Sequence, residues 1–132
     1  MRDGIRAIKG GSHAAAQALF TVTLDTLITK LIPDATRRSP ITKRKTGHPV
    51  PAAIDDMGLR RVFVWLPIWN SHGKFWASKG HNVPSDYSRH ASVHAVSRVL
   101  YSKRNCIQAL MLITSLLGYT QQLIDRRSRR ET

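Results

Sequence analysis

The sequence predicts an all-α fold, a four- to five-helix bundle with a long basic loop after the first helix. Three observations predict it. Apolar residues recur at helical spacing over 13–32 and over 52–79, and residues 103–126 are apolar nearly all round. Stretches that contain proline and glycine separate these segments. From the length of 132 residues we expect a single helical domain, which would cover residues 12–126.

The first expected helix, residues 13–32, follows a flexible arm. Residues 1–11 are polar and contain three glycines, so we expect no regular structure in the arm. Ser12 is a suitable N-cap, and the alanines that follow it favour a helix. Pro33 ends this helix because its ring and its missing N–H stop continuation.

Residues 33–51 are the expected basic loop. They contain four prolines and show no apolar periodicity, which is typical of a segment without helix or strand. A solvated loop that binds nothing explains this composition as well as a functional loop does. If the loop binds nucleic acid, its contacts with phosphates would come from Arg37, Arg38, Lys43, Arg44 and Lys45.

Residues 52–79 are expected to be helical, with a kink or break at Pro67 and a second break at 70–73. Five aromatic residues lie between Phe63 and Trp76, interleaved with aliphatic ones. Aromatic residues at such spacing usually pack in the core, but they can also stack on bases of single-stranded nucleic acid. Both interpretations stay open.

The C-terminal half is expected to form a short helix over 87–99, capped by Ser85 or Asp86, and a long helix over 103–126, capped by Ser102. The long helix is apolar nearly all round, so it is either central in its domain or shared with a partner subunit. The tail, residues 127–132, is basic and is expected to fray.

Charge is the strongest bulk feature of the chain. Its 21 Lys and Arg against 8 Asp and Glu give a net charge of +13. Such a field favours polyanions, so RNA is the expected partner and DNA the alternative. Cys106 is the single cysteine and cannot form an internal disulfide, which fits a cytoplasmic protein. The apolar run 107–119 is shorter than the ~20 residues of a membrane span, so we expect no membrane association.

One stretch, residues 87–95, holds an arginine and two histidines. On a helix His90 and His94 share a face, and Arg89 lies to one side. Histidine can accept and donate a proton near neutral pH, and the guanidinium of arginine matches phosphate oxygens. RNA carries its own nucleophile, the 2′-hydroxyl. A histidine and an arginine therefore suffice to cleave RNA without a metal, leaving a 2′,3′-cyclic phosphate and a 5′-hydroxyl.

The spacing Arg89-His90-x-x-x-His94 resembles the motif of the HEPN family. Members are small all-helical modules, many of them metal-independent ribonucleases of toxin–antitoxin, abortive-infection and CRISPR systems. The resemblance implies a HEPN-like fold, catalytic roles for Arg89 and His94, and no cofactor. His90 stands where the family most often has Asn and is expected to support the pair. Family members commonly dimerise with two motifs at one cleft, which implies a homodimer formed through the last helix.

A longer stretch, residues 80–125, is also similar to the C-terminal part of uncharacterised bacterial and phage proteins with an Asn/Ser-Arg-His-x-x-x-His-Gly/Ala core. In those proteins the segment is often the end of a longer chain, which implies that this chain is a short or truncated member of that group. The HEPN resemblance suggests a role in phage defence or as a toxin.

Other interpretations of the cluster remain. With Asp86 or His81, the two histidines could hold zinc, although the Glu of a His-Glu-x-x-His motif is absent. They could also be a surface pair without chemistry. The runner-up function is a non-catalytic module that binds nucleic acid through the loop, the tail, Lys103 and Arg104, or a protein through the last helix. The Arg-His…His pattern of tyrosine recombinases has different spacing and does not fit.

Overall fold

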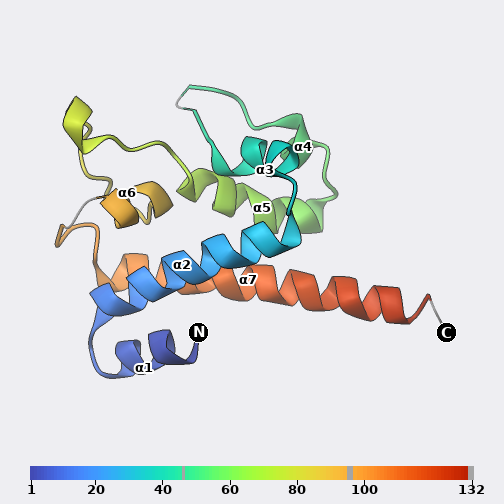
Figure 1. Cartoon of the computed structure of the whole chain (residues 1–132), viewed down its shortest axis with the longest axis horizontal. Coiled ribbons are helices and arrows are strands. Elements are labelled where there is room, and N and C mark those ends of the chain that lie inside the picture. Colours follow the sequence, from blue (N-terminus) through green and yellow to red (C-terminus); the bar gives the residue numbers. More distant parts are fainter. Residues whose placement is uncertain (46, 95–96, 131–132) are drawn as a thin grey trace.

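The structure is a computed structural model that describes residues 1–45, 47–94 and 97–130, and it is all-α as predicted (Figure 1). Helices account for 69% of it, and the described residues contain no strand. In chain order the helices are α1 (Arg2–Lys9), α2 (His13–Leu31), α3 (Ala35–Thr42), α4 (Ala52–Asp55), α5 (Leu59–Ser71), the short 3-10 helix η1 (Ala77–Lys79), α6 (Arg89–His94) and α7 (Lys103–Ser128).

The two longest helices, α2 and α7, lie side by side through the middle of the molecule (Figure 1). Helix α1 packs on α2, and helices α3 to α5 lie on the opposite side of the pair in this view. The core where these helices meet is fully buried and apolar, which is the main source of their stability. Its largest apolar side chains that are no more than 1% exposed are Phe20, Leu24, Ile28, Ile54, Ile68, Ile113 and Leu116.

Residues 2–9 form helix α1, so the expectation of a flexible arm over 1–11 was wrong there. The reason is a tertiary contact that propensity does not show. Gly4 is buried against Phe20, and a Cβ at Gly4 would lie 2.4 Å from Phe20 Cε1. The missing side chain lets α1 approach α2 closely, and the contact outweighs the low helix propensity of glycine.

The expected basic loop also contains a helix, α3, over 35–42. The Asp34 carboxylate accepts hydrogen bonds from the backbone N–H groups of Thr36 and Arg37 at 2.7 and 3.0 Å, which caps this helix. These bonds hold the pKa of Asp34 below its usual range. Ile41 is buried and fixes α3 on the core, with Pro40 inside the helix. The expectation of a structureless segment therefore fails over 35–42.

Helix α5 runs through Pro67 without ending, so the segment does not split there, and it ends at Ser71 where the second break was predicted. Of the short helix or helix-like turn expected over 87–99, helix α6 covers 89–94, and residues 95–96 lie outside the described residues. The capping residue is neither Ser85 nor Asp86, because the Ser88 hydroxyl accepts the hydrogen bond from the backbone N–H of Ala91 at 3.2 Å.

Helix α7 begins as predicted, since the Ser102 hydroxyl accepts a hydrogen bond from the backbone N–H of Asn105. One face of α7 carries Ala109, Ile113 and Leu116 into the core. By length and composition alone α7 is also apolar enough to cross a membrane, with a mean hydropathy of 1.2 over its best window, 17% of which is buried. Its C-terminal turns extend beyond the other helices in Figure 1.

Candidate functional site

Arg89, the first residue of α6, forms a bidentate ion pair with Asp25 in the middle of α2. The Nε of Arg89 donates to both carboxylate oxygens at 2.9 and 2.8 Å, and Nη2 donates to Oδ2. The pair is partly buried where α6 packs on α2. The Nη1 of Arg89 has no hydrogen-bond partner in the described part of the chain, so it remains able to bind a ligand.

Asp25 and Arg89 each favour the charged form of the other. Burial would raise the pKa of the Asp25 carboxyl, but the nearby His72 ring and the hydrogen-bonded, charged guanidinium of Arg89 outweigh it and lower that pKa. The hydrogen bonds to Asp25 raise the pKa of Arg89 against the opposing effect of its burial. Both groups are therefore charged at neutral pH, and Asp25 holds the guanidinium in one orientation.

His72, just after α5, is a buried third member of this group. Its Nδ1 donates to the carbonyl of Ile68 at 2.7 Å, and its Nε2 lies 3.8 Å from Oδ1 of Asp25. Within the described residues the buried Nε2 has no hydrogen-bond partner. Because Nδ1 carries the donated proton, Nε2 presents a lone pair when the ring is neutral and a second donor when it is protonated.

His90 and His94 lie side by side as predicted, with ring centroids 4.6 Å apart. The Nδ1 of His90 accepts a hydrogen bond from the backbone N–H of Phe75 at 3.1 Å, so in the neutral ring the proton is on Nε2. Burial, followed by the charge of His94, lowers the pKa of His90. At neutral pH His90 is therefore a hydrogen-bond donor through Nε2.

His94 has more freedom than His90. It is exposed, and neither of its ring nitrogens forms a hydrogen bond to a residue that the structure describes. A histidine held only by a ring contact can accept and release protons, whereas His90 has one nitrogen committed to the backbone. Of the two, His94 is the better acid–base group.

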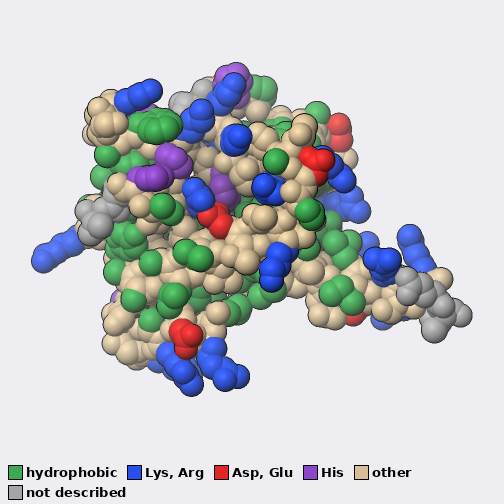
Figure 2. Space-filling view, in the orientation of Figure 1, with side chains coloured by type: hydrophobic (Ala, Val, Ile, Leu, Met, Phe, Trp, Pro, Cys, Tyr) green, Lys and Arg blue, Asp and Glu red, His purple; other side chains and the backbone are tan. Residues whose placement is uncertain are grey.

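A cavity of about 520 Å³ opens beside Arg89 and His90. Its lining contains four basic residues and one carboxylate, Asp25, which is already paired with Arg89. The lysines that line it are exposed and form no ion pair with a described residue. Histidine and basic side chains gather around α6 in Figure 2, and the cavity therefore favours an anion. Its charged and ring-bearing lining residues are Asp25, Arg38, Lys43, His72, Lys74, Trp76, Arg89 and His90.

The structure brings together only some of the predicted site residues. Arg38, Lys43, Arg89 and His90 line the cavity, and His94 lies next to it through its contact with His90. Arg38 also donates from Nη1 to the carbonyl of Ile32 at 2.6 Å, which anchors its head at the end of α2.

The remaining predicted contacts lie elsewhere. Arg44 lies over the ring of Trp69 at 4.6 Å and donates to the carbonyl of Asn70, so its head is held against α5 outside this cavity. Arg104 pairs with Asp86 at 2.7 Å. The other three are exposed and do not line the cavity: Arg37, Lys45 and Lys103.

Sequence reasoning missed Asp25, His72 and Lys74. Asp25 and His72 are far from the cluster in the chain and carry no motif. One signal could have pointed to Asp25, because it lies next to buried Leu24 and is the only acidic residue of α2. A carboxylate beside a buried position usually has a partner.

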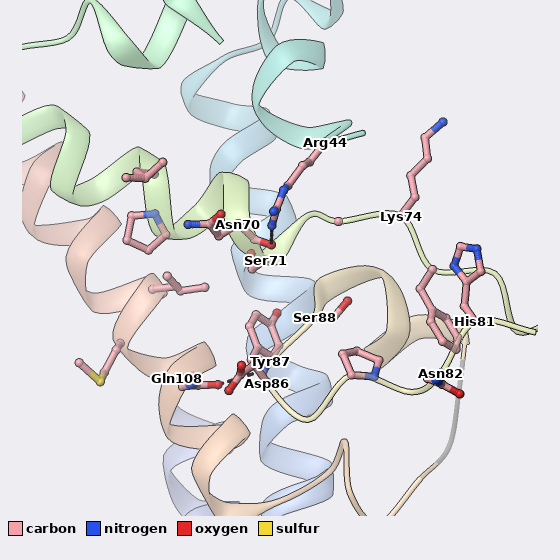
Figure 3. A pocket seen from close by; sticks show the side chains of 17 residues that line it. Arg44, Asn70, Ser71, Lys74, His81, Asn82, Asp86, Tyr87, Ser88 and Gln108 are labelled. Carbon is pink, nitrogen blue, oxygen red and sulfur yellow. Dashed lines mark hydrogen bonds between the residues drawn. The ribbon is translucent and has the colours of Figure 1, made fainter. Parts of the chain in front are cut away.

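A second cavity, of about 690 Å³, lies between α5, α7 and the segment 81–88 (Figure 3). Arg44 points toward Asn70 at its edge, while Tyr87 and Gln108 line another side. Neither Arg89 nor a cluster histidine lines it, although Lys74 borders both cavities. Its Asp86 pairs with Arg104, and Nδ1 of its His81 accepts a hydrogen bond from the backbone N–H of Trp76, so the smaller cavity is the candidate site.

The described residues contain no group of three or more His, Cys, Asp or Glu side chains that could hold a metal ion. Asp86 and His81, the suggested third zinc ligands, contact Arg104 and Phe75. Comparisons with protein-family models, with curated proteins and with solved structures found no match. The resemblance to the HEPN family therefore stays a prediction from the motif.

Proposed function

We propose that the chain is a metal-independent endoribonuclease of HEPN type, with a HEPN-like helical fold. The observation that best supports this proposal is the ion pair from Asp25, which fixes Arg89 at the wall of a basic cavity beside the two histidines. An arginine held in one orientation, a neutral donor histidine and an exposed histidine whose ring nitrogens bind no described residue are the groups that metal-free RNA cleavage needs.

The proposed chemistry assigns one task to each side chain. The Nη1 of Arg89 and the Nε2–H of His90 bind non-bridging phosphate oxygens and stabilise the charge of the phosphorane. His94 takes the proton of the 2′-hydroxyl as that oxygen bonds to phosphorus and the bond to the 5′-oxygen breaks. His94 of a second copy gives a proton to the leaving 5′-oxygen in the proposed homodimer. The products are a 2′,3′-cyclic phosphate and a 5′-hydroxyl.

The proposal includes RNA as the partner, a cytoplasmic location without membrane association, and a role in phage defence or as a toxin. The dimer would use the exposed face of α7 that carries Ile107 and Met111, which lie four residues apart and are both accessible. An exposed apolar helix face can pack against a second helix or against a membrane. We propose that this face packs against α7 of the second copy.

A non-catalytic nucleic-acid-binding module is the second candidate function. The observation that favours it is that Asp25 already neutralises Arg89, while Lys43 and Lys74 remain free to bind phosphates. Binding through these lysines alone would need neither histidine. DNA would then serve as a ligand as well as RNA.

Cleavage and binding assays in EDTA separate the two candidates. Arg89→Ala and His94→Ala should each lower single-turnover RNA cleavage by ~100-fold or more and leave RNA binding largely intact. The double variant Lys43→Ala/Lys74→Ala should lose affinity for RNA, whereas Lys9→Ala, which changes an exposed lysine on α1, should not. RNA that stays intact with wild type, at concentrations that bind it fully, supports the binding module instead.

A further inference from the structure

Trp76 differs from most aromatic residues of its segment in its exposure. Trp65, Trp69 and Phe75 are 3%, 5% and 4% exposed and belong to the core, while Trp76 is 43% exposed. The sequence left open whether these aromatics are core residues or base-stacking residues. The structure divides them, because three are buried and Trp76 stands at the candidate site.

The position of Trp76 is fixed by contacts on both sides. Its backbone N–H donates to Nδ1 of His81 at 3.3 Å. Its ring packs edge-on against the ring of His90, with centroids 5.5 Å apart and planes at 65°. The ammonium of Lys79 lies 5.4 Å from the ring centroid. The side chain is therefore held next to His90 while much of its surface stays accessible to a ligand.

Trp76 lines the same cavity as Arg89, Lys43 and Lys74. An exposed aromatic ring beside cations is the arrangement with which proteins bind unpaired nucleic acid, since bases stack on the ring while the cations contact the backbone. We propose that Trp76 stacks on a base next to the scissile phosphate and thereby selects single-stranded RNA. This inference rests on the proposed ribonuclease function and names its substrate class.

Selection of an unpaired base follows from the geometry of stacking. In a duplex both faces of each base are covered by neighbouring bases, so no face is free for an indole ring. An unpaired base has a free face, and stacking on aromatic residues tolerates every base type. The site should therefore bind single-stranded RNA in preference to duplex RNA and show little preference for base sequence.

The test uses fluorescence anisotropy with a labelled single-stranded RNA and the matching duplex, in the His94→Ala protein so that the RNA stays intact. Trp76→Ala should weaken single-strand binding by roughly 5- to 150-fold and change duplex binding little. Phe63→Ala is the matched control, because Phe63 is exposed on α5 and lines neither cavity. An RNA with an abasic nucleotide at the stacking position should bind the His94→Ala parent more weakly by a similar factor. The same RNA should bind the Trp76→Ala variant almost as well as the intact RNA does.

Tryptophan emission gives a readout that does not depend on the alanine variant. Trp65 and Trp69 are buried, so single-stranded RNA should quench emission in the parent and not in Trp76→Phe. Unchanged single-strand affinity in Trp76→Ala overturns the stacking proposal even if wild type cleaves RNA. Loss of affinity in Trp76→Ala without cleavage by wild type overturns the ribonuclease and keeps the stacking site. A parent that binds neither RNA overturns both.

Discussion

Arg89 on α6 binds both carboxylate oxygens of Asp25 on α2, and this pair joins the motif helix to the central helix of the fold. Helix α6 has only six residues, too few to be stable alone. Its place in the structure depends on contacts with α2, of which the ion pair is the one that also orients a proposed site residue.

Asp25→Asn should lower both stability and activity. The variant keeps the shape of Asp25 but leaves a partly buried guanidinium without its counter-charge, so the free energy of unfolding should fall by about 1–2 kcal/mol. RNA cleavage should fall ~10- to 100-fold because Arg89 is no longer oriented. Urea unfolding and single-turnover cleavage measure the two effects. Asp55→Asn on α4, an exposed control outside the cavity, should change neither.

The stability effect of Asp25→Asn should depend on pH in one direction. The pKa of Asp25 is lower in the folded protein than its ordinary value of 3.8, so the unfolded state takes up the proton first as pH falls. The stabilisation from Asp25 is therefore complete above about pH 5 and is lost as pH falls through the folded pKa. A difference between wild type and Asp25→Asn that grows below about pH 4 would contradict the ion pair.

Gly4→Ala should destabilise the fold. The added Cβ would lie 2.4 Å from Phe20 Cε1, and the fully buried Phe20 ring has no free space to move into. A loss of about 1–3 kcal/mol in the free energy of unfolding is expected. Gly118→Ala is the matched control, since its Cβ would meet nothing within 4 Å on α7 and should stabilise by about 0.5–1 kcal/mol. Equal effects of the two variants would show that α1 does not pack on Phe20.

The pKa of His90 should lie below its ordinary 6.5 and rise when His94 is removed. Burial is the main cause of the lowered pKa, and the charge of His94 is the second. In His94→Ala only the second cause disappears, so the pKa should rise toward 6.5 without reaching it. NMR titration of the histidine ring signals measures this change. A His90 pKa that is the same in wild type and His94→Ala would mean that the two rings are apart in solution.

The sequence was sufficient for the fold class and the main helices. Apolar periodicity located α2 and α7, and Ser102 marked the start of α7. It failed for α1 and α3, because each is held by tertiary contacts with the core, such as those of Gly4 and Ile41, that local propensity does not contain. Of the kink or break expected at Pro67, the break does not occur, since α5 continues through this residue and packs on the core.

The candidate site was predictable only where it is local in sequence. The i,i+4 spacing correctly placed His90 beside His94. Asp25 reaches the cavity from α2, and His72 and Trp76 reach it from the connection between α5 and η1, so only tertiary packing brings them to Arg89. The sequence also could not distinguish the basic residues that line the cavity from those that lie elsewhere. Arg44 has the same charge as Lys43 but lies over Trp69 instead of lining the cavity.

Analysis of RNA products in EDTA tests the central claim most directly. Wild type and His94→Ala, purified side by side, are incubated with single-stranded RNA, and the ends of the products are determined by mass spectrometry. The proposed mechanism predicts 2′,3′-cyclic phosphate and 5′-hydroxyl ends from wild type and intact RNA with His94→Ala. Intact RNA with both proteins, equal cleavage by both, or products with 5′-phosphate ends would contradict it.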